Sequence, residues 1–203
     1  MELRVTDLAC LRGGMIVLSS LTFSVTAGQA LMLRGPNGVG KTTLLRTLAG
    51  LQPPASGRIT VPEEAIAYAA HSDGLKSMLT VGENLSFWGT VFGHPVDAAL
   101  DRMDLAHLRD RPAQTLSAGQ RRRLGLARLL VAGRPIWLLD EPTISLDVAS
   151  VTMFEGVVRD HLASGGLALI ASHIDIAVGA TVLDLAPHAT RTIEAKGFDE
   201  AFL

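Results

Sequence analysis

Cysteine is nearly absent from this 203-residue sequence, and the single Cys10 cannot form an internal disulfide bond. No apolar run approaches the ~20 residues of a membrane-spanning helix. The first residues lack the basic and apolar regions of a secretory signal peptide. The formal net charge of −2 gives no general attraction for nucleic acid. Together these absences predict a cytoplasmic protein that does not cross a bilayer and has no nucleic-acid partner.

Aromatic residues are also scarce, at 4% of the chain, whereas 48% of it is apolar, which suits one compact domain, 1–203, with a sizeable core. Alternating apolar residues predict a hairpin of residues 2–9 and 16–25, and further strands at 29–34, 57–61, 65–69, 136–139 and 167–171. Helical spacing predicts helices over 41–50, 81–91, 96–108, 117–131 and 148–163. This order is typical of an α/β fold with a mainly parallel sheet, here with an N-terminal antiparallel β layer and an inserted helical lobe at 72–134. Residues 187–203 carry no strong pattern.

A glycine-rich stretch follows the strand at 29–34 and fits the pattern G-x-x-x-x-G-K-[ST]. It consists of Gly35, Pro36, Asn37, Gly38, Val39, Gly40, Lys41, Thr42 and Thr43. Its glycines allow successive backbone N–H groups to point inward around a phosphate, and the helix that begins near Lys41 adds partial positive charge. We expect Lys41 to reach the β and γ phosphates and the Thr42 hydroxyl to bind Mg²⁺. The stretch therefore predicts a nucleoside triphosphate site.

Two acidic residues follow the apolar strand at 136–139. Asp140 stands where a buried strand would deliver a carboxylate to Mg²⁺, mostly through water. Glu141, one residue further, would orient or deprotonate the attacking water. Alone, this pattern could be a strand that runs into a turn. Together with the stretch at 35–43, it indicates ATP hydrolysis.

Another short segment begins the helix at 117–131. Ser117 and Gln120 have the spacing of a capping box, in which each side chain bonds the other residue's backbone N–H. Ser117, the Gly119 amide and the helix N-terminus could instead bind an anion such as a γ-phosphate. These residues alone do not decide between the two interpretations. The three arginines at 121–123 are interpreted first as a solvated helix face.

Taken in order, the segments 35–42, 116–120, 138–143 and 145–147 and then His173 resemble the motif set of ABC transporter ATPase subunits, over residues 2 to about 185. The resemblance implies a P-loop NTPase fold and a head-to-tail homodimer that binds two ATP molecules between its subunits. It implies that Ser117, Gly119 and Gln120 contact the ATP of the other subunit. It also implies that Asp147 lies at the seam of the dimer and that His173 contacts the γ-phosphate.

Two positions depart from the pattern of this family. Arg12 stands where an aromatic residue usually stacks on adenine, although a guanidinium plane can also stack on a base. His71 stands where a glutamine usually touches the metal and the water and senses the membrane partner. Histidine changes its charge near neutral pH, so coupling to the partner could depend on pH. Alternatively, the register is shifted by one or two residues and His71 is an ordinary surface residue.

Local features narrow the resemblance to the haem-exporter ATPases of bacterial cytochrome c maturation. They are the short length, Arg12, His71 with the residues at 74–76, the segment 79–85, and Ala118. This resemblance implies a peripheral location on the cytoplasmic face of the inner membrane. It implies integral membrane subunits of the CcmB type, with the CcmC type as a further candidate, and a role in releasing haem-loaded chaperone. The chain has no C-x-x-C-H sequence and no paired histidines, so we do not expect it to bind haem directly.

Three other functions remain open. An ATPase subunit for an exporter of another cargo would share all of these motifs. A soluble ATP-gated clamp on DNA or ribosomes generally carries a long coiled coil or two tandem cassettes, and this sequence has neither. A small-molecule kinase would leave 116–120 and Asp147 without a role.

Overall fold

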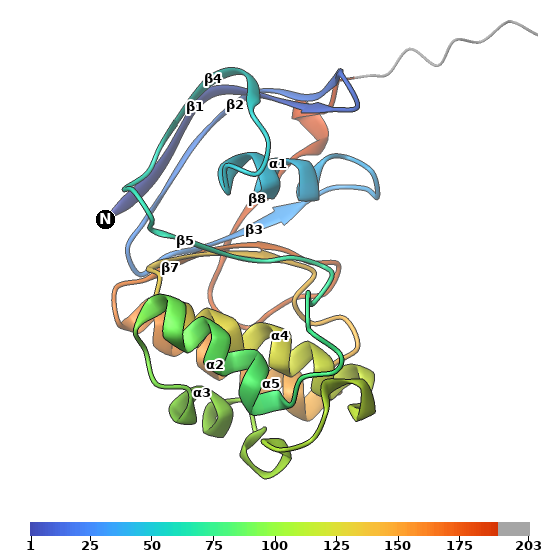
Figure 1. Ribbon diagram of the computed structural model, residues 1–203. Helices are drawn as coiled ribbons and strands as arrows, with labels where there is room; N and C mark the ends of the chain where they lie inside the picture. Colours follow the sequence, from blue (N-terminus) through green and yellow to red (C-terminus); the bar gives the residue numbers. More distant parts are fainter. Residues whose placement is uncertain (191–203) are drawn as a thin grey trace, which may run out of the picture.

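The computed structural model describes residues 1–190 and arranges them in two sheets and a helical layer (Figure 1). Within this part, no helix has both the length and the apolar character needed to cross a membrane. Of the stretch 187–203, only its first four residues are described. The short 3₁₀ helix Ala186–His188 ends there, and Ala189 forms a single β-bridge with Leu18. The rest of that stretch lies outside the described residues.

The antiparallel sheet has the strand order β2-β1-β4, formed by β1 Glu2–Arg12, β2 Met15–Thr26 and β4 Pro54–Thr60. The predicted hairpin is confirmed, and its turn places Gly13 and Gly14 at φ 56° and 81°. The strand predicted at 57–61 begins three residues earlier, at Pro54. Proline is tolerated there because β4 is an edge strand.

The second sheet has five parallel strands in the order β5-β6-β7-β3-β8. They are β3 Ala30–Arg34, β5 Ile66–Ala69, β6 Ile136–Asp140, β7 Leu167–Ala171 and β8 Thr181–Asp184. This confirms the mainly parallel sheet. Strand β8 was not predicted. It is short, lies at an edge of the sheet and is mostly exposed, so it lacks the apolar run of a buried strand.

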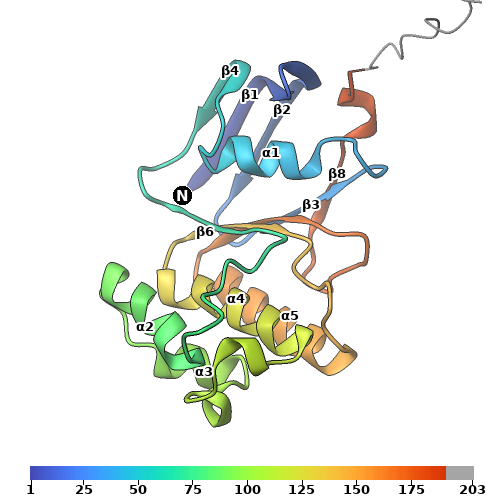
Figure 2. The same cartoon turned by 45° about the vertical axis from the view of Figure 1, so that its right-hand side comes forward.

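The described residues contain five α-helices, which lie on both sides of the parallel sheet (Figures 1 and 2). They are α1 Lys41–Leu48, α2 Val81–Phe92, α3 Asp97–Arg102, α4 Ala118–Ala132 and α5 Val148–Ala163. Helix α1 lies between the two sheets, and α2 to α5 lie beyond the other face of the parallel sheet. The predicted ranges of α1, α2, α4 and α5 agree with the structure to within two residues.

The helix predicted over 96–108 is wrong in its second half. Helix α3 ends at Arg102, and a separate 3₁₀ turn covers Ala106–Leu108. Asp104 adopts a left-handed conformation, with φ 51°, and the backbone N–H of Leu105 donates to the carbonyl of Leu100 at 2.8 Å. This hydrogen bond closes the helix in the manner of a C-terminal capping motif. The apolar spacing continues past the break, which is why it predicted a longer helix.

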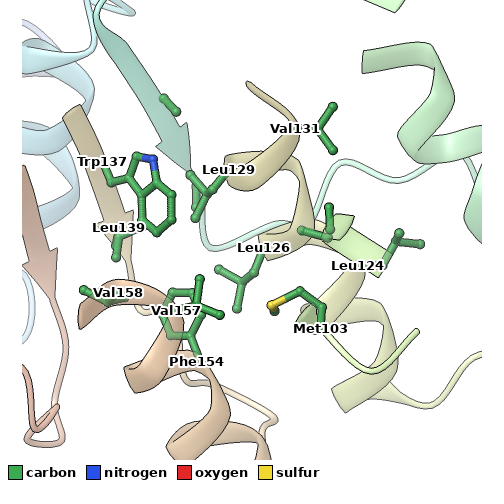
Figure 3. Close-up of a cluster of buried hydrophobic side chains, with 14 of the residues drawn as sticks. Met103, Leu124, Leu126, Leu129, Val131, Trp137, Leu139, Phe154, Val157 and Val158 are labelled. Atoms are coloured by element: carbon green, nitrogen blue, oxygen red, sulfur yellow. The ribbon is translucent and has the colours of Figure 1, made fainter. Parts of the chain in front are cut away.

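Strand β6 contributes to two separate hydrophobic cores because successive side chains point to opposite faces. Ile136 and Leu138 join the core shared with α1 and the antiparallel sheet. Trp137 and Leu139 join the other core, where Figure 3 shows them with side chains of α4 and α5, namely Leu126, Leu129, Phe154, Val157 and Val158. All five residues of β6 are buried. The strand therefore fixes the position of Asp140 at its end.

Candidate functional site

The glycine-rich loop connects β3 to α1 in a conformation that requires glycine. Gly35 and Gly40 have φ values of 137° and 115°. A Cβ atom on Gly40 would lie 2.9 Å from Leu18 Cδ1. The Leu44 N–H donates to the Gly40 carbonyl at 2.8 Å, so the helix begins at Lys41 as predicted. The sequence thus folds into a loop that delivers a helix N-terminus beside backbone N–H groups.

Lys41 places a positive charge beside this loop. Its ammonium group donates to the carbonyl of Gly35 at 2.9 Å and to that of Pro36 at 3.4 Å, and the residue is only 9% exposed. A mostly buried cation next to a helix N-terminus attracts an anion such as a phosphate.

Asp140 receives hydrogen bonds on both oxygens of its carboxylate. The Thr42 hydroxyl lies 3.1 Å from Oδ1, and the Tyr68 hydroxyl lies 3.3 Å from Oδ2. Burial, followed by the negative charge of Asp140, raises the pKa of Tyr68 to about 12, so this phenol stays protonated as a donor. A hydroxyl and a carboxylate are the oxygen ligands that Mg²⁺ prefers. The Thr42 hydroxyl and the Asp140 carboxylate are thus of the chemical type that suits a magnesium ion. The contact from Tyr68 was not predicted.

Glu141 and His173 form a pair at the ends of β6 and β7. Glu141 Oε1 lies 3.2 Å from His173 Nε2, and its Oε2 accepts a hydrogen bond from the His173 backbone N–H at 3.3 Å. Arg34 holds the same segment by donating to the carbonyl of Ser172 at 2.7 Å and pairing with Asp175. A carboxylate oriented by a neighbouring group is suited to accept a proton from water. The sequence analysis predicted both members of the pair but not Arg34.

Most of the predicted site residues line one groove of about 530 Å³. It is lined by Arg12, Asn37, Gly38, Gly40, Lys41, Thr42, Thr43, Asp140, Glu141 and His173, together with Arg46 and Gln52. Arg46 and Gln52 were not predicted. Arg46 lies in the last turn of α1, so counting one helical turn on from Thr42 would have indicated it. The groove therefore brings the glycine-rich loop, the Thr42–Asp140 contact and the Glu141–His173 pair into a single hollow.

Other predicted residues do not line this groove. His71 is exposed, and its backbone carbonyl accepts a hydrogen bond from Arg122. Ser117 and Gln120 form the predicted capping box, with hydrogen bonds of 3.2 Å and 2.9 Å between side chains and backbone N–H groups. Gly119 lies so close to Ser145 that a Cβ atom would be 3.0 Å from its carbonyl oxygen. Ser117, Gly119 and Gln120 therefore lie together at the start of α4, outside the groove.

Asp147 has a structural role that was not predicted. It is the N-cap of α5, and its Oδ1 accepts a hydrogen bond from the Ser150 N–H at 2.8 Å. This bond holds the pKa of Asp147 below its ordinary value. The side chain is therefore charged and exposed at the start of α5.

The interpretation of 121–123 as a solvated helix face is wrong for two of its three arginines. Arg121 is exposed, but Arg122 and Arg123 are only 4% and 9% exposed. Their guanidinium groups donate to main-chain carbonyls and to the carboxylates of Asp73 and Asp104. A buried cation is tolerated when its donors are satisfied in this way. Spacing along the chain could not show these partners, because Asp73 is 49 residues away from Arg122.

Comparisons with known proteins agree with this geometry. Residues 18–144 match the family model described as "ABC transporter". The chain is 63% identical over 194 residues to the cytochrome c biogenesis ATP-binding export protein CcmA of Cereibacter sphaeroides, covering 95% of this chain and 92% of that one. It is 60% identical to CcmA of Ruegeria pomeroyi over the full length of both chains. A Pyrococcus furiosus protein, provisionally described as an ABC transporter ATP-binding protein, has the same fold, with a TM-score of 0.84, 24% identity, and coverage of 94% of this chain and all of that one.

Proposed function

The chain belongs to the ABC transporter family and, within it, to the CcmA group of ATP-binding subunits. On this basis we propose which residues hydrolyse ATP and which proteins the chain binds. It is an ATP-hydrolysing subunit of an ABC transporter. The observation that carries the residue assignments is the single groove that joins the loop at 35–43 to Asp140, Glu141 and His173.

The backbone N–H groups of the loop and the Lys41 ammonium would bind the β and γ phosphates. Thr42 and Asp140 would hold Mg²⁺, which offsets the charge of those phosphates when it is bound. Arg12 lines the same groove, and its guanidinium would stack on the base. These three contacts position the γ-phosphate beside Glu141.

Glu141 would accept a proton from the attacking water as general base. His173 supports this role because its imidazole and its backbone N–H both contact the Glu141 carboxylate. His173 is also 54% exposed, which leaves it free to contact a γ-phosphate. Hydrolysis therefore depends on a carboxylate that is oriented before ATP arrives.

A second copy of the chain would complete each site. Ser117, Gly119 and Gln120 lie at the start of α4, outside the groove of their own chain. The capping box uses the N–H groups of Ser117 and Gln120, so the donors proposed for a phosphate are the Ser117 hydroxyl, the Gly119 N–H and the Gln120 side-chain amide. In a head-to-tail dimer they would contact the γ-phosphate bound by the other copy, with Asp147 at the seam. Binding of ATP would then favour the closed dimer, because only the closed form gains these contacts.

Membrane subunits would receive the motion of the helical sub-lobe at 72–134. Apolar side chains are exposed there, with Met78 75%, Phe87 59% and Val91 57% exposed. Phe87 and Val91 are four residues apart on α2 and so share one face of that helix, which offers a partner an apolar surface. The names of the relatives support a role in cytochrome c biogenesis. We therefore assign integral membrane partners of the CcmB type, with the CcmC type as a further candidate. ATP hydrolysis would power the release of haem-loaded chaperone outside the membrane, with the chain peripheral on the cytoplasmic face.

The substitution Glu141→Gln tests the catalytic assignment. It should reduce kcat by about 10²- to 10⁴-fold, the usual contribution of general-base catalysis, while the Kd for ATP stays within about twofold. Glu64→Gln is a matched control, because Glu64 is an exposed glutamate that pairs with Arg134 away from the groove. ATP hydrolysis by the Glu141→Gln variant at the wild-type rate would show that another group is the base.

Purification of the chain from membranes tests the assembly. Co-purification of integral membrane proteins of the cytochrome c maturation system is the expected result. Co-purification with membrane proteins of a different exporter would assign another cargo, and co-sedimentation with nucleic acid alone would contradict the transporter assignment.

A further inference from the structure

Arg122 is a buried cation of α4 whose guanidinium group lies directly behind the candidate base. Its side chain is 4% exposed. Every donor nitrogen of the group is used. Nε donates to the Pro142 carbonyl at 3.0 Å, Nη2 to the carbonyls of Asp140 and Glu141 at 3.1 and 2.8 Å, and Nη1 to the carbonyls of Ala70 and His71 at 2.9 and 3.4 Å and to Asp73 Oδ1 at 2.8 Å.

These partners divide into two sets. Asp73, together with the carbonyls of Ala70 and His71, compensates the charge of the guanidinium on one side, since a buried cation requires a counter-charge and satisfied donors. On the other side, Nε and Nη2 reach three consecutive carbonyls, those of residues 140–142. A planar guanidinium presents its donors in a fixed fork. It therefore fixes the orientation of the successive peptide planes on either side of Glu141.

Glu141 needs such support, because its backbone is left-handed. Its φ is 49°, a conformation that residues with a Cβ atom rarely adopt. From the sheet side, the Glu141 N–H donates to the Ala171 carbonyl at 2.8 Å. From the helix side, Arg122 holds the carbonyls. This backbone conformation directs the Glu141 carboxylate toward His173 in the groove.

We propose that Arg122 is a positioning residue for hydrolysis, whose guanidinium holds the left-handed backbone of Glu141 so that its carboxylate faces the γ-phosphate. This inference rests on the proposed role of Glu141 as the base. Lysine at this position would keep the positive charge beside Asp73, but an ammonium group has three donors at one point and cannot span the three carbonyls. The positive charge would remain, but the hydrogen bonds that orient the carbonyls of residues 140–142 would be lost.

Arg123 provides a matched control on the same helix. It is 9% exposed and donates to the carbonyls of Met103 and Asp104 at 2.9 and 3.0 Å and to Asp104 Oδ2 at 2.8 Å. Arg122→Lys and Arg123→Lys thus disturb two largely buried guanidinium groups, of which only the first donates hydrogen bonds to residues 140–142. Both variants should melt at a lower temperature than the wild type.

The decisive measurement is the steady-state hydrolysis of ATP by the full chain, well below the melting temperature of each variant. Arg122→Lys should lower kcat by about 10- to 100-fold, as expected for a small misplacement of a catalytic group, with the Kd for a fluorescent ATP analogue unchanged. Arg123→Lys should keep kcat within about twofold of the wild type. If Arg122→Lys does not fold, Arg122→Gln, whose side chain is polar but shorter and uncharged, takes its place with the same expectation.

Two results would overturn the positioning role alone. One is a wild-type kcat for Arg122→Lys beside an inactive Glu141→Gln variant. The other is an equal loss of kcat in Arg122→Lys and Arg123→Lys, which would indicate general loosening of α4. Normal hydrolysis by Glu141→Gln would instead overturn the proposed base, and the role of Arg122 with it.

Discussion

Replacing Ser117 with aspartate separates the two roles of this side chain, the helix cap and the proposed phosphate contact. The Ser117 hydroxyl accepts a hydrogen bond from the Gln120 N–H at 3.2 Å, and an aspartate oxygen caps a helix at least as well. Ser117→Asp should therefore keep the wild-type melting temperature. Ser117→Ala removes the cap and should cost about 1 kcal/mol, or roughly 2–4 °C in a chain of this length.

The effect of Ser117→Asp on hydrolysis should be much larger. If a γ-phosphate binds at the start of α4, the new carboxylate would lie about 4 Å from it, and the repulsion would be about 4 kcal/mol per unit charge at an effective dielectric constant of about 20. This corresponds to about a thousandfold loss of affinity for the closed, ATP-bound state. Ser117→Thr keeps both the cap and the hydroxyl and should retain hydrolysis.

A mixing experiment shows whether Ser117 acts on the ATP of its own chain or of a second copy. In a head-to-tail dimer of one Ser117→Asp chain and one Glu141→Gln chain, both defects fall in one site and the other site is intact. With random pairing, half of the dimers are mixed, so two inactive variants should together regain about a quarter of the wild-type activity if the sites work independently. No recovery on mixing would contradict the shared site. Wild-type hydrolysis by Ser117→Asp would refute the phosphate contact altogether.

Two further predictions concern Tyr68 and His161. Tyr68→Phe removes one hydrogen bond to Asp140, which is worth about 0.5–1.5 kcal/mol. The Mg²⁺ concentration for half-maximal hydrolysis should therefore rise about two- to tenfold. An unchanged Mg²⁺ concentration for half-maximal hydrolysis, measured by titration, would contradict this prediction. Burial lowers the pKa of His161 from its ordinary value of 6.5. Between these two pKa values the unfolded chain binds more protons than the folded chain. The free energy of unfolding should therefore decrease as the pH falls from 6.5 through the lowered pKa of the folded state. His161→Phe keeps a ring stacked on Trp137, where the present rings lie 3.8 Å apart. It should remove that part of the pH dependence in unfolding experiments between pH 7.5 and 5, and an unchanged pH dependence would rule His161 out.

The parts of the fold that the sequence predicted are those fixed by neighbouring residues. The glycines at 35 and 40 are needed for positive φ angles, so the pattern itself determines the loop. The continuous apolar run of β6 predicts a buried strand, and Asp140 and Glu141 follow it at once. Likewise, the spacing of Ser117 and Gln120 was enough to predict the capping box.

The parts that the sequence did not predict depend on residues far apart in the chain. Tyr68 reaches Asp140 across 72 positions, and Arg34 reaches Asp175 across 141. Only the packing of β5 against β6, and the joining of β3 to β7, bring these pairs together. The break after α3 is different, because it depends on the left-handed backbone of Asp104, which apolar spacing does not encode.

The burial of Arg122 and Arg123 in α4 has a physical cause that can be predicted from the sequence only in part. The chain leaves the sheet after Asp140, the last residue of β6 that pairs with β7, and the carbonyls of residues 140–142 accept hydrogen bonds from Arg122. A buried carbonyl must still be paired, and a guanidinium group can satisfy several at once because it has five N–H donors. The residues 124–127 and Leu129 are buried and apolar, so α4 turns this side of its first turns inward. Arginines that directly precede such a run are therefore better interpreted as donors to the ends of neighbouring strands than as a solvated face.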